Sequence, residues 1–159
     1  MLDSTTIKVH QHASGAKKWA KKPGAVERWL TTKGHAVTDG LGNLLSFLLS
    51  GRNCHDICMA QTLLEPFDLT GKLILADKGY DSTKFIRWVK QRGGIVVIPS
   101  CINAKSPRDI DWHTYKERHL IEKLFLKLKN HRRFSTRYEK KACFFHTVLS
   151  IACILVWLL

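Results

Sequence analysis

A β-hairpin signal between residues 33 and 50 sets the strongest limit on how this chain can fold. Two runs, KGHAV and LLSFLLS, flank the stretch TDGLGN, which holds an Asp-Gly pair and a second glycine. Turn residues of this kind between two such runs are typical of adjacent antiparallel strands. The opening stretch MLDSTTIKVHQ is rich in β-branched residues and alternates along its length, which predicts a further strand. The first 50 residues therefore predict an antiparallel sheet.

Helices and short apolar strands alternate after the hairpin. HDICMAQTLLEPF and DSTKFIRWVKQRGG have helical spacing, whereas KLILA and IVVIP are short apolar runs. A long helix that contains YKERHLIEKLFLKLK follows. Strands that are separated by helices are typical of parallel pairs joined by crossovers. We therefore predict an α/β fold in one domain, residues 1–159, with a mixed sheet of antiparallel and parallel parts and flanking helices.

Two segments stand apart from this alternation. Residues 11–32 are rich in Gly, Lys and Pro and predict a basic loop. Residues 139–159 predict a C-terminal helix, whose last seventeen residues are apolar on every face apart from His146 and Ser150. A membrane span needs about 20 apolar residues. We expect a buried terminal helix, with a membrane helix as the alternative.

Charge and cysteine content limit the partners. The chain has 159 residues and a formal net charge of +13, which favours a polyanionic partner, most commonly nucleic acid. A basic protein without such a partner is the alternative. The five cysteines form no even disulfide framework and predict reduced thiols in the cytoplasm. The stretch CHDIC, residues 54–58, lacks a second pair with metal-ligand spacing, which disfavours zinc.

Most acidic residues have a structural explanation. Turn or helix-cap positions are predicted for Asp39, Asp56, Asp81, Asp109 and Asp111. Asp3 and Asp77 have none, because Asp3 lies inside a predicted strand, where aspartate is disfavoured, and Asp77 ends one. Ligand sites of open α/β sheets lie beyond the carboxyl ends of strands. Asp3 and Asp77 are therefore candidates for chemistry.

The long helix carries two glutamates in different positions. At about 100° per residue, Tyr115, Arg118, Glu122 and Lys129 fall on one narrow polar stripe beside the apolar face. Glu117 falls on the apolar side of the first turn, where it can interact with the helix dipole. The wheel alone leaves open that the stripe is a solvated surface with ion pairs.

Several motifs together resemble a known family. LDSTT, LADKGYDS and the spacing of the Tyr-Arg-Glu-Lys stripe resemble the DDE transposases of bacterial insertion sequences, in the branch of the insertion-sequence-five type. The likeness continues through HASGAKK, LTTKGHAVTDGLGN, YKERHLIEKLF, RRFSTRYEK and the closing WL. It covers essentially the whole chain.

This resemblance implies both a fold and a reaction. The implied fold is ribonuclease-H-like, and the implied metal ligands are Asp3, Asp77 and Glu122. The implied reaction is DNA strand cleavage and strand transfer at insertion-sequence ends, with two Mg²⁺ ions for which Mn²⁺ can substitute. The implied partners are transposon-end and target DNA and further copies of the chain in an active complex, without a membrane.

Basic and aromatic residues supply candidate DNA contacts. Arg118 and Lys129 share the stripe of Glu122 and are placed to hold phosphate, and Tyr115 can stack on a base or bond a phosphate. The full set of expected DNA contacts is Tyr115, Arg118, Lys129, Arg132, Arg133, Arg137, Lys17 and Lys18. Trp19 and Trp29 lie beside basic residues and either stack on bases or pack within the loop.

Two alternative functions stay open. One is a metal-dependent endonuclease of the same fold. The other is a non-catalytic DNA-binding remnant, or a fragment that is completed by frameshifting. Because Asp3 lies two residues after Met1, we expect the chain to lack the N-terminal helical region that the resemblance assigns to recognition of transposon ends.

Overall fold

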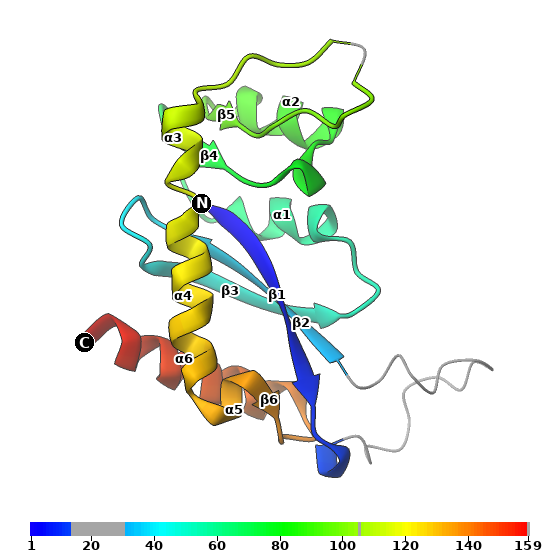
Figure 1. Cartoon of the computed structure of the whole chain (residues 1–159), viewed down its shortest axis with the longest axis vertical. Coiled ribbons are helices and arrows are strands. Elements are labelled where there is room, and N and C mark those ends of the chain that lie inside the picture. The colour runs from blue at the N-terminus through cyan, green and yellow to red at the C-terminus, as the bar shows by residue number, and fades with distance from the viewer. Residues whose placement is uncertain (14–30, 105, 159) are drawn as a thin grey trace, which may run out of the picture.

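The computed structural model describes residues 1–13, 31–104 and 106–158 (Figure 1). Its elements in chain order are β1 (Leu2–Val9), η1 (Gln11–Ala13), β2 (Thr31–Thr38), β3 (Leu44–Gly51), α1 (Asp56–Leu64), β4 (Leu73–Leu75), η3 (Lys78–Tyr80), α2 (Thr83–Gln91), β5 (Ile95–Val97), α3 (Trp112–Lys116), α4 (His119–Asn130), α5 (Arg132–Ser135), β6 (Thr136–Arg137) and α6 (Ala142–Leu158). Most of the predicted basic loop lies outside the described residues, and so do Lys17, Lys18, Trp19 and Trp29.

Four strands form a mixed sheet in the order β3-β2-β1-β6. β2 pairs antiparallel with both β1 and β3, whereas β6 pairs parallel with β1. In the turn between β2 and β3, Asp39 Oδ1 accepts hydrogen bonds from the backbone amides of Leu41 and Asn43, both at 2.8 Å. Gly42 has a φ of 87°, which few residues other than glycine adopt. The predicted hairpin is confirmed.

The strands β4 and β5 pair in parallel, but in a two-stranded sheet of their own. Each strand has only three residues, so few of its backbone groups are available to bond a further strand such as β1. Directly after β4 the chain turns into η3 instead of extending alongside β1. The α/β class with a mixed sheet and flanking helices is confirmed, whereas the expectation that the parallel strands join that sheet is corrected to two separate sheets.

Two apolar clusters hold the elements together. One contains Ile7 of β1 and Ala36 of β2, together with buried side chains of α4 and α6. The other contains Leu2 of β1 and Val37 of β2, together with buried side chains of α1, α2 and β4. Because side chains alternate along a strand, Asp3 belongs to the face of Ile7, which α4 and α6 cover. The fold therefore directs Asp3 toward α4.

The predicted long helix is interrupted at Glu117 and Arg118, between α3 and α4. The His119 ring Nδ1 donates a hydrogen bond to the Lys116 carbonyl at 2.8 Å, and the Leu120 amide bonds the Glu117 carbonyl at 3.0 Å. In a continuous α-helix the Leu120 amide would bond the Lys116 carbonyl. The Leu120 amide instead bonds one residue closer, which is the tighter spacing of a 3₁₀ turn, and the His119 ring bonds the Lys116 carbonyl.

The consequences of this break differ for the two faces of the helix. The predicted apolar face of α4 is confirmed, because Ile121, Leu124 and Leu128 are buried. Glu117 was expected on the apolar side of the first turn, but it is exposed. The expectation was wrong because it assumed one uninterrupted helix.

The last helix, α6, packs only one face against the core. Phe145 and Leu149 are fully buried there. Large apolar side chains that stay exposed on α6 are Phe144, Ile151, Ile154, Leu155, Trp157 and Leu158. The expected buried helix is therefore observed on one face only. Within residues 1–13, 31–104 and 106–158, no helix is long and apolar enough to cross a membrane.

Helix caps depart from the prediction at two positions. Asp111 caps α3 as predicted, because its carboxylate accepts the backbone amide two residues further on, at 2.9 Å. Asp56 instead pairs with Lys33, with 2.8 Å between Oδ1 and Nζ, and Asp81 pairs with Arg108, with 2.7 Å between Oδ1 and Nη2. In both cases a charged partner from a distant part of the chain replaces the weaker backbone donor.

Candidate functional site

The first two predicted site residues come from the strand regions. Asp3 lies near the start of β1 on the face covered by α4. Asp77 follows β4, where it precedes η3 and its Oδ1 accepts a hydrogen bond from the Gly79 amide at 2.9 Å. In Figure 1 the N-terminus lies beside the junction of α3 and α4. These elements place both aspartates close to the start of α4.

Arg118 connects Asp3 to the third predicted residue, Glu122. Its Nη1 lies 2.9 Å from Asp3 Oδ2, and its Nη2 pairs with Glu122 Oε1. The break in the helix places Arg118 at the N-cap of α4, one turn before Glu122. A guanidinium group carries donors in a rigid fork, so it can serve two carboxylates at once.

The three predicted carboxylates form one electrostatically coupled group. Burial raises the pKa of Asp3, the Ser4 amide and Arg118 lower it, and the Asp77 and Glu122 carboxylates raise it; the net pKa lies above the ordinary value. Burial alone would lower the pKa of Arg118, but Asp3, Glu122 and Asp77 raise it above its ordinary value. The fold thus brings together charges from β1, the end of β4, and α4.

The donor set suits a hard divalent cation in its chemistry. It offers carboxylate oxygens without thiol or imidazole, which is the set that Mg²⁺ prefers. In the part of the chain that the structure describes, no three His, Cys, Asp or Glu side chains lie close enough together to hold a metal ion. Arg118 provides the positive charge between two of the carboxylates. Binding an ion at these residues therefore requires a rearrangement of side chains.

Of the predicted DNA contacts, Lys129, Arg132 and Arg133 are exposed at the end of α4 and on α5. The guanidinium of Arg132 lies 5.8 Å from the ring centre of Tyr138. Tyr115 is half-buried, and the guanidinium of Arg118 lies 6.0 Å from the centre of its ring. The elements that carry these residues follow one another along the chain, and in Figure 1 α4 runs from its junction with α3 toward α5.

Arg137 differs from the other predicted DNA contacts. Its guanidinium donates to the Thr32 hydroxyl at 3.0 Å and to the carbonyls of Glu139 and Lys140 at 2.8 and 3.0 Å. It also lies 5.5 Å from the centre of the Phe145 ring, and burial lowers its pKa. Its donors are thus engaged within the chain, where they hold β6 to β2.

A polar network around His35 was missed by the sequence predictions. His35 is fully buried, and its Nε2 lies 2.7 Å from the Ser50 hydroxyl. Its Nδ1 lies 3.3 Å from Asp56 Oδ1, the oxygen that also pairs with Lys33. The signal was present, because Lys33 and His35 are two residues apart in a strand and so lie on the same face. The network joins β2 and β3 to α1.

We predict that this network makes folding sensitive to acid. Burial lowers the pKa of His35 from its ordinary value of 6.5, although Asp56 opposes the shift. The unfolded chain therefore binds a proton at a higher pH than the folded chain. The stability from neutral His35 is complete above pH 6.5 and is lost as the pH falls through the folded pKa. Urea denaturation from about pH 7.5 to about pH 5.5 measures this loss.

Two variants give this measurement its controls. His35→Gln should reduce the loss of stability with acid, and His113→Gln, at an exposed position, should keep the wild-type dependence. A His35→Gln chain that loses as much free energy of unfolding as the wild type over this range would contradict the prediction.

Tyr80 lies near both the His35 network and the predicted site. Its hydroxyl is buried and has no hydrogen-bond partner among the described residues. Burial raises the pKa of Tyr80, and the carboxylates of Asp56, Asp3 and Asp77 raise it further. The Tyr80 hydroxyl therefore stays protonated and neutral, and it lies near the carboxylates of Asp56, Asp3 and Asp77.

Asp81 and Arg108 anchor the segment that carries Asp77. Arg108 Nη2 donates to Asp81 Oδ1 at 2.7 Å and to the Ile98 carbonyl at 3.2 Å. The other oxygen of Asp81 accepts the Cys101 amide at 2.7 Å. These bonds join the turn after β4 to the loop after β5. They limit how far Asp77 can move relative to β5.

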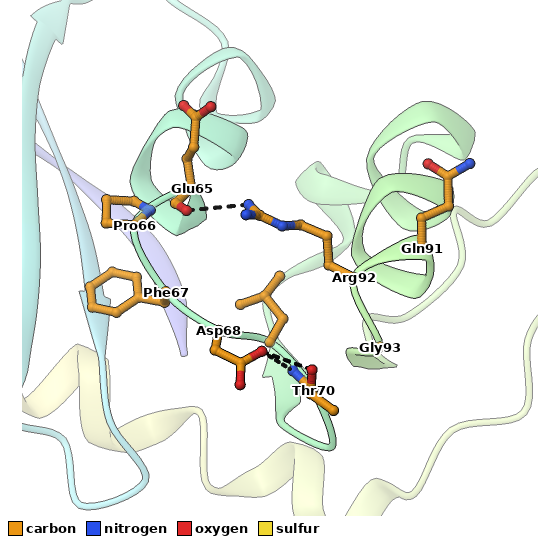
Figure 2. A pocket seen from close by; sticks show the side chains of 9 residues that line it. Glu65, Pro66, Phe67, Asp68, Thr70, Gln91, Arg92 and Gly93 are labelled. Carbon is orange, nitrogen blue, oxygen red and sulfur yellow. Dashed lines mark hydrogen bonds between the residues drawn. The ribbon is translucent and has the colours of Figure 1, made fainter.

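A hollow of the described surface lies away from these carboxylates. It has a volume of about 560 Å³ and lies before β4 and β5, between Glu65–Thr70 and Gln91–Gly93. Figure 2 shows Arg92 directed toward the Glu65 carbonyl across it, at 3.3 Å. Asp77 follows β4 at its opposite end, so this hollow is separate from the candidate site.

Comparison with known proteins agrees with the sequence motifs. The chain matches the family model described as Transposase DDE domain over residues 1–157. It is 36% identical over 133 residues to a protein of Brucella ovis named as a candidate transposase for insertion sequence element IS6501, and the match spans 81% of this chain and 99% of that protein. It is 29% identical over 135 residues to a protein of Burkholderia cepacia named in the same way for IS402, and that match spans 79% of this chain and 62% of that protein.

No solved structure matches the chain. Because the family model covers nearly all of the sequence, the chain belongs to the DDE transposase family.

Proposed function

We propose that this chain is a transposase catalytic domain that cleaves DNA strands and transfers them with divalent metal ions at Asp3, Asp77 and Glu122. The observation that carries the proposal is the pairing of Arg118 with both Asp3 and Glu122 in a member of the DDE family. A ribonuclease-H-like arrangement is part of the same proposal and rests on the family resemblance, since β4 lies in a sheet separate from that of β1. The insertion-sequence-five type of branch is part of the same proposal and rests on the sequence motifs.

The metal chemistry follows from the kind of ligand. Two Mg²⁺ ions, when bound, would activate the attacking water or 3′-hydroxyl and stabilise the leaving oxygen. Asp3, Asp77 and Glu122 would hold them, and Mn²⁺ can take the place of Mg²⁺ at carboxylate ligands. The part played by the rest of the fold is positional: the Asp81–Arg108 pair restrains the turn that carries Asp77, and α4 sets the direction of Glu122.

We further propose that DNA lies along α4 and α5. Lys129, Arg132 and Arg133 are exposed there and would contact phosphates without reading the sequence. Tyr115 lies at the other end of this surface, near the carboxylates. The internal contacts of Arg137 favour a structural role for it over a direct contact with DNA.

Salt dependence tests this DNA surface. Replacing Arg133 by alanine should remove one phosphate contact and lower the magnitude of the log–log salt slope by about 0.9. Fluorescence anisotropy of a labelled duplex between about 50 and 200 mM salt measures the slope. Arg87→Ala, at an exposed arginine of α2, should leave it unchanged. Equal decreases in both variants would indicate a diffuse basic surface and contradict the proposed path.

The product formed separates transposase from endonuclease. A labelled duplex that carries the end of the element and a free 3′-hydroxyl is incubated with a supercoiled plasmid and Mg²⁺. We expect label joined to the plasmid. Cleavage without joining would favour the endonuclease, and DNA binding with neither product would favour the non-catalytic remnant.

Self-association in an active complex stays a prediction from the family resemblance. The exposed apolar side chains of α6, which include Phe144, Ile151 and Trp157, offer a surface for it. Exposed large apolar side chains of this kind are often found at interaction sites.

A further inference from the structure

Arg118 lies where a cation is needed, between two of the proposed metal ligands. We propose that Arg118 is the internal counter-ion of this site, and that divalent ions bind by displacing it from Asp3 and Glu122. The inference rests on the proposed function, because it takes the three carboxylates as the metal ligands.

The contacts of Arg118 are divided between two distant segments. Nη1 bonds Asp3 Oδ2 at 2.9 Å across 115 positions of the sequence, and Nη2 pairs with Glu122 Oε1 on its own helix. The side chains of Arg118 and Asp3 are 19% and 17% exposed, whereas that of Glu122 is 51% exposed. The contact with Asp3 is therefore shielded from water more than an ordinary surface ion pair, and it holds the start of α4 against β1.

These contacts use the same oxygens that a metal ion needs. Carboxylates that converge without a cation repel one another, and Arg118 relieves that repulsion for two of the three. A divalent ion that binds Asp3 Oδ2 and Glu122 Oε1 competes with the guanidinium for their lone pairs and for their charge. The ion can bind only those molecules in which Arg118 is unpaired. The apparent affinity of the site for the ion is therefore the intrinsic affinity multiplied by the fraction of unpaired molecules.

An alternative role for Arg118 predicts the opposite sign. If Arg118 only positions Asp3 and Glu122 for the ion, its removal should weaken metal binding. If it is a competing counter-ion, its removal should strengthen metal binding and destabilise the protein when no divalent ion is present. The direction of the change in metal affinity therefore separates the two roles.

The experiment compares Mn²⁺ binding by the wild-type chain and the Arg118→Met variant, without DNA, by electron paramagnetic resonance of free Mn²⁺. We expect the variant to bind Mn²⁺ about tenfold more tightly, the change that corresponds to losing one charged hydrogen bond as a competitor. In EDTA its thermal unfolding should begin at a lower temperature than that of the wild type. Mn²⁺ should raise the unfolding temperature of the variant more than that of the wild type.

Two further variants complete the comparison. Lys116→Met removes one positive charge at an exposed position two residues earlier, and it should leave Mn²⁺ affinity nearly unchanged. Arg118→Lys keeps the charge, but a single ammonium replaces the fork that reaches both carboxylates. It should bind Mn²⁺ with intermediate affinity, and it also tests the proposal if circular dichroism shows that Arg118→Met does not fold.

The possible results are distinct. If the wild type binds Mn²⁺ and both Arg118 variants bind it equally well or more weakly, the counter-ion proposal is overturned and the proposed function stands. If Asp3→Asn, Asp77→Asn and Glu122→Gln each bind Mn²⁺ as well as the wild type does, the carboxylates are not the ligands, and the proposed function fails together with this inference.

Discussion

Replacing Asp3 or Asp77 by asparagine, or Glu122 by glutamine, is expected to abolish Mg²⁺-dependent DNA cleavage and strand transfer. Each change removes the charge of a proposed metal ligand while keeping the size of the side chain. Loss of an outer partner of a metal ligand costs about 10- to 100-fold in affinity or activity. Loss of a direct ligand should cost more, so rates should fall by more than about 100-fold. Initial rates on a labelled transposon-end duplex measure the effect.

Glu117→Gln is the matched control for Glu122→Gln. Glu117 is exposed at the break between α3 and α4, five residues before Glu122. Its substitution should leave the cleavage rate within about twofold of wild type, since exposed positions away from a site have small effects. Loss of cleavage in Glu117→Gln with normal cleavage in Glu122→Gln would show that the ligand assignment on this helix is wrong.

Truncation of Phe145 is expected to have the largest effect on stability among single changes in α6. Phe145 is fully buried in the apolar cluster beneath α4 and α6, and the guanidinium of Arg137 packs on its ring. Phe145→Ala should lower the free energy of unfolding by about 3 to 5 kcal/mol, because it removes buried surface and leaves a cavity. Urea denaturation monitored by circular dichroism measures the change.

The neighbouring phenylalanine provides the control. The side chain of Phe144 is 58% exposed. Phe144→Ala should change the free energy of unfolding by no more than about 0.5 kcal/mol. Similar losses in the two variants would mean that α6 does not dock on the core through the face of Phe145.

The features that could be predicted from the sequence depend on short-range patterns. The hairpin follows from turn residues at Asp39–Gly42, and the buried face of α4 follows from the spacing of Ile121, Leu124 and Leu128. Both patterns lie within a few residues of the elements that they specify. Such signals need no tertiary contact to be recognised, and for this reason the sequence predicts these elements.

The features that could not be predicted depend on contacts between distant segments. Asp56 looked like a helix cap, but Lys33 and His35 of β2 provide charged and buried partners for it. At the break after α3 the His119 ring bonds the Lys116 carbonyl, a contact that helical periodicity does not encode. β4 and β5 have three residues each and pair only with each other among the described strands, and the lengths of these strands were not predictable from the apolar runs.

The candidate site was predictable in part. Asp3 and Asp77 were selected because no local role explained them, and Glu122 followed from the family resemblance. The polar stripe of the helix placed Arg118 beside Glu122. The bond from Arg118 to Asp3 joins α4 to β1, and no pattern of neighbouring residues predicts it. Its contact with both carboxylates is therefore a property of the fold.

Binding of divalent metal ions by Asp3, Asp77 and Glu122 can be observed by locating Mn²⁺ in a crystal of this chain. Crystals soaked in Mn²⁺ would be measured at the manganese absorption edge. We expect anomalous density within coordination distance, about 2.0 to 2.6 Å, of oxygens from all three carboxylates. We also expect that Arg118 is no longer in contact with Asp3 and Glu122. Anomalous density confined to other side chains, with the Arg118 contacts intact, would show that these carboxylates are not the metal ligands.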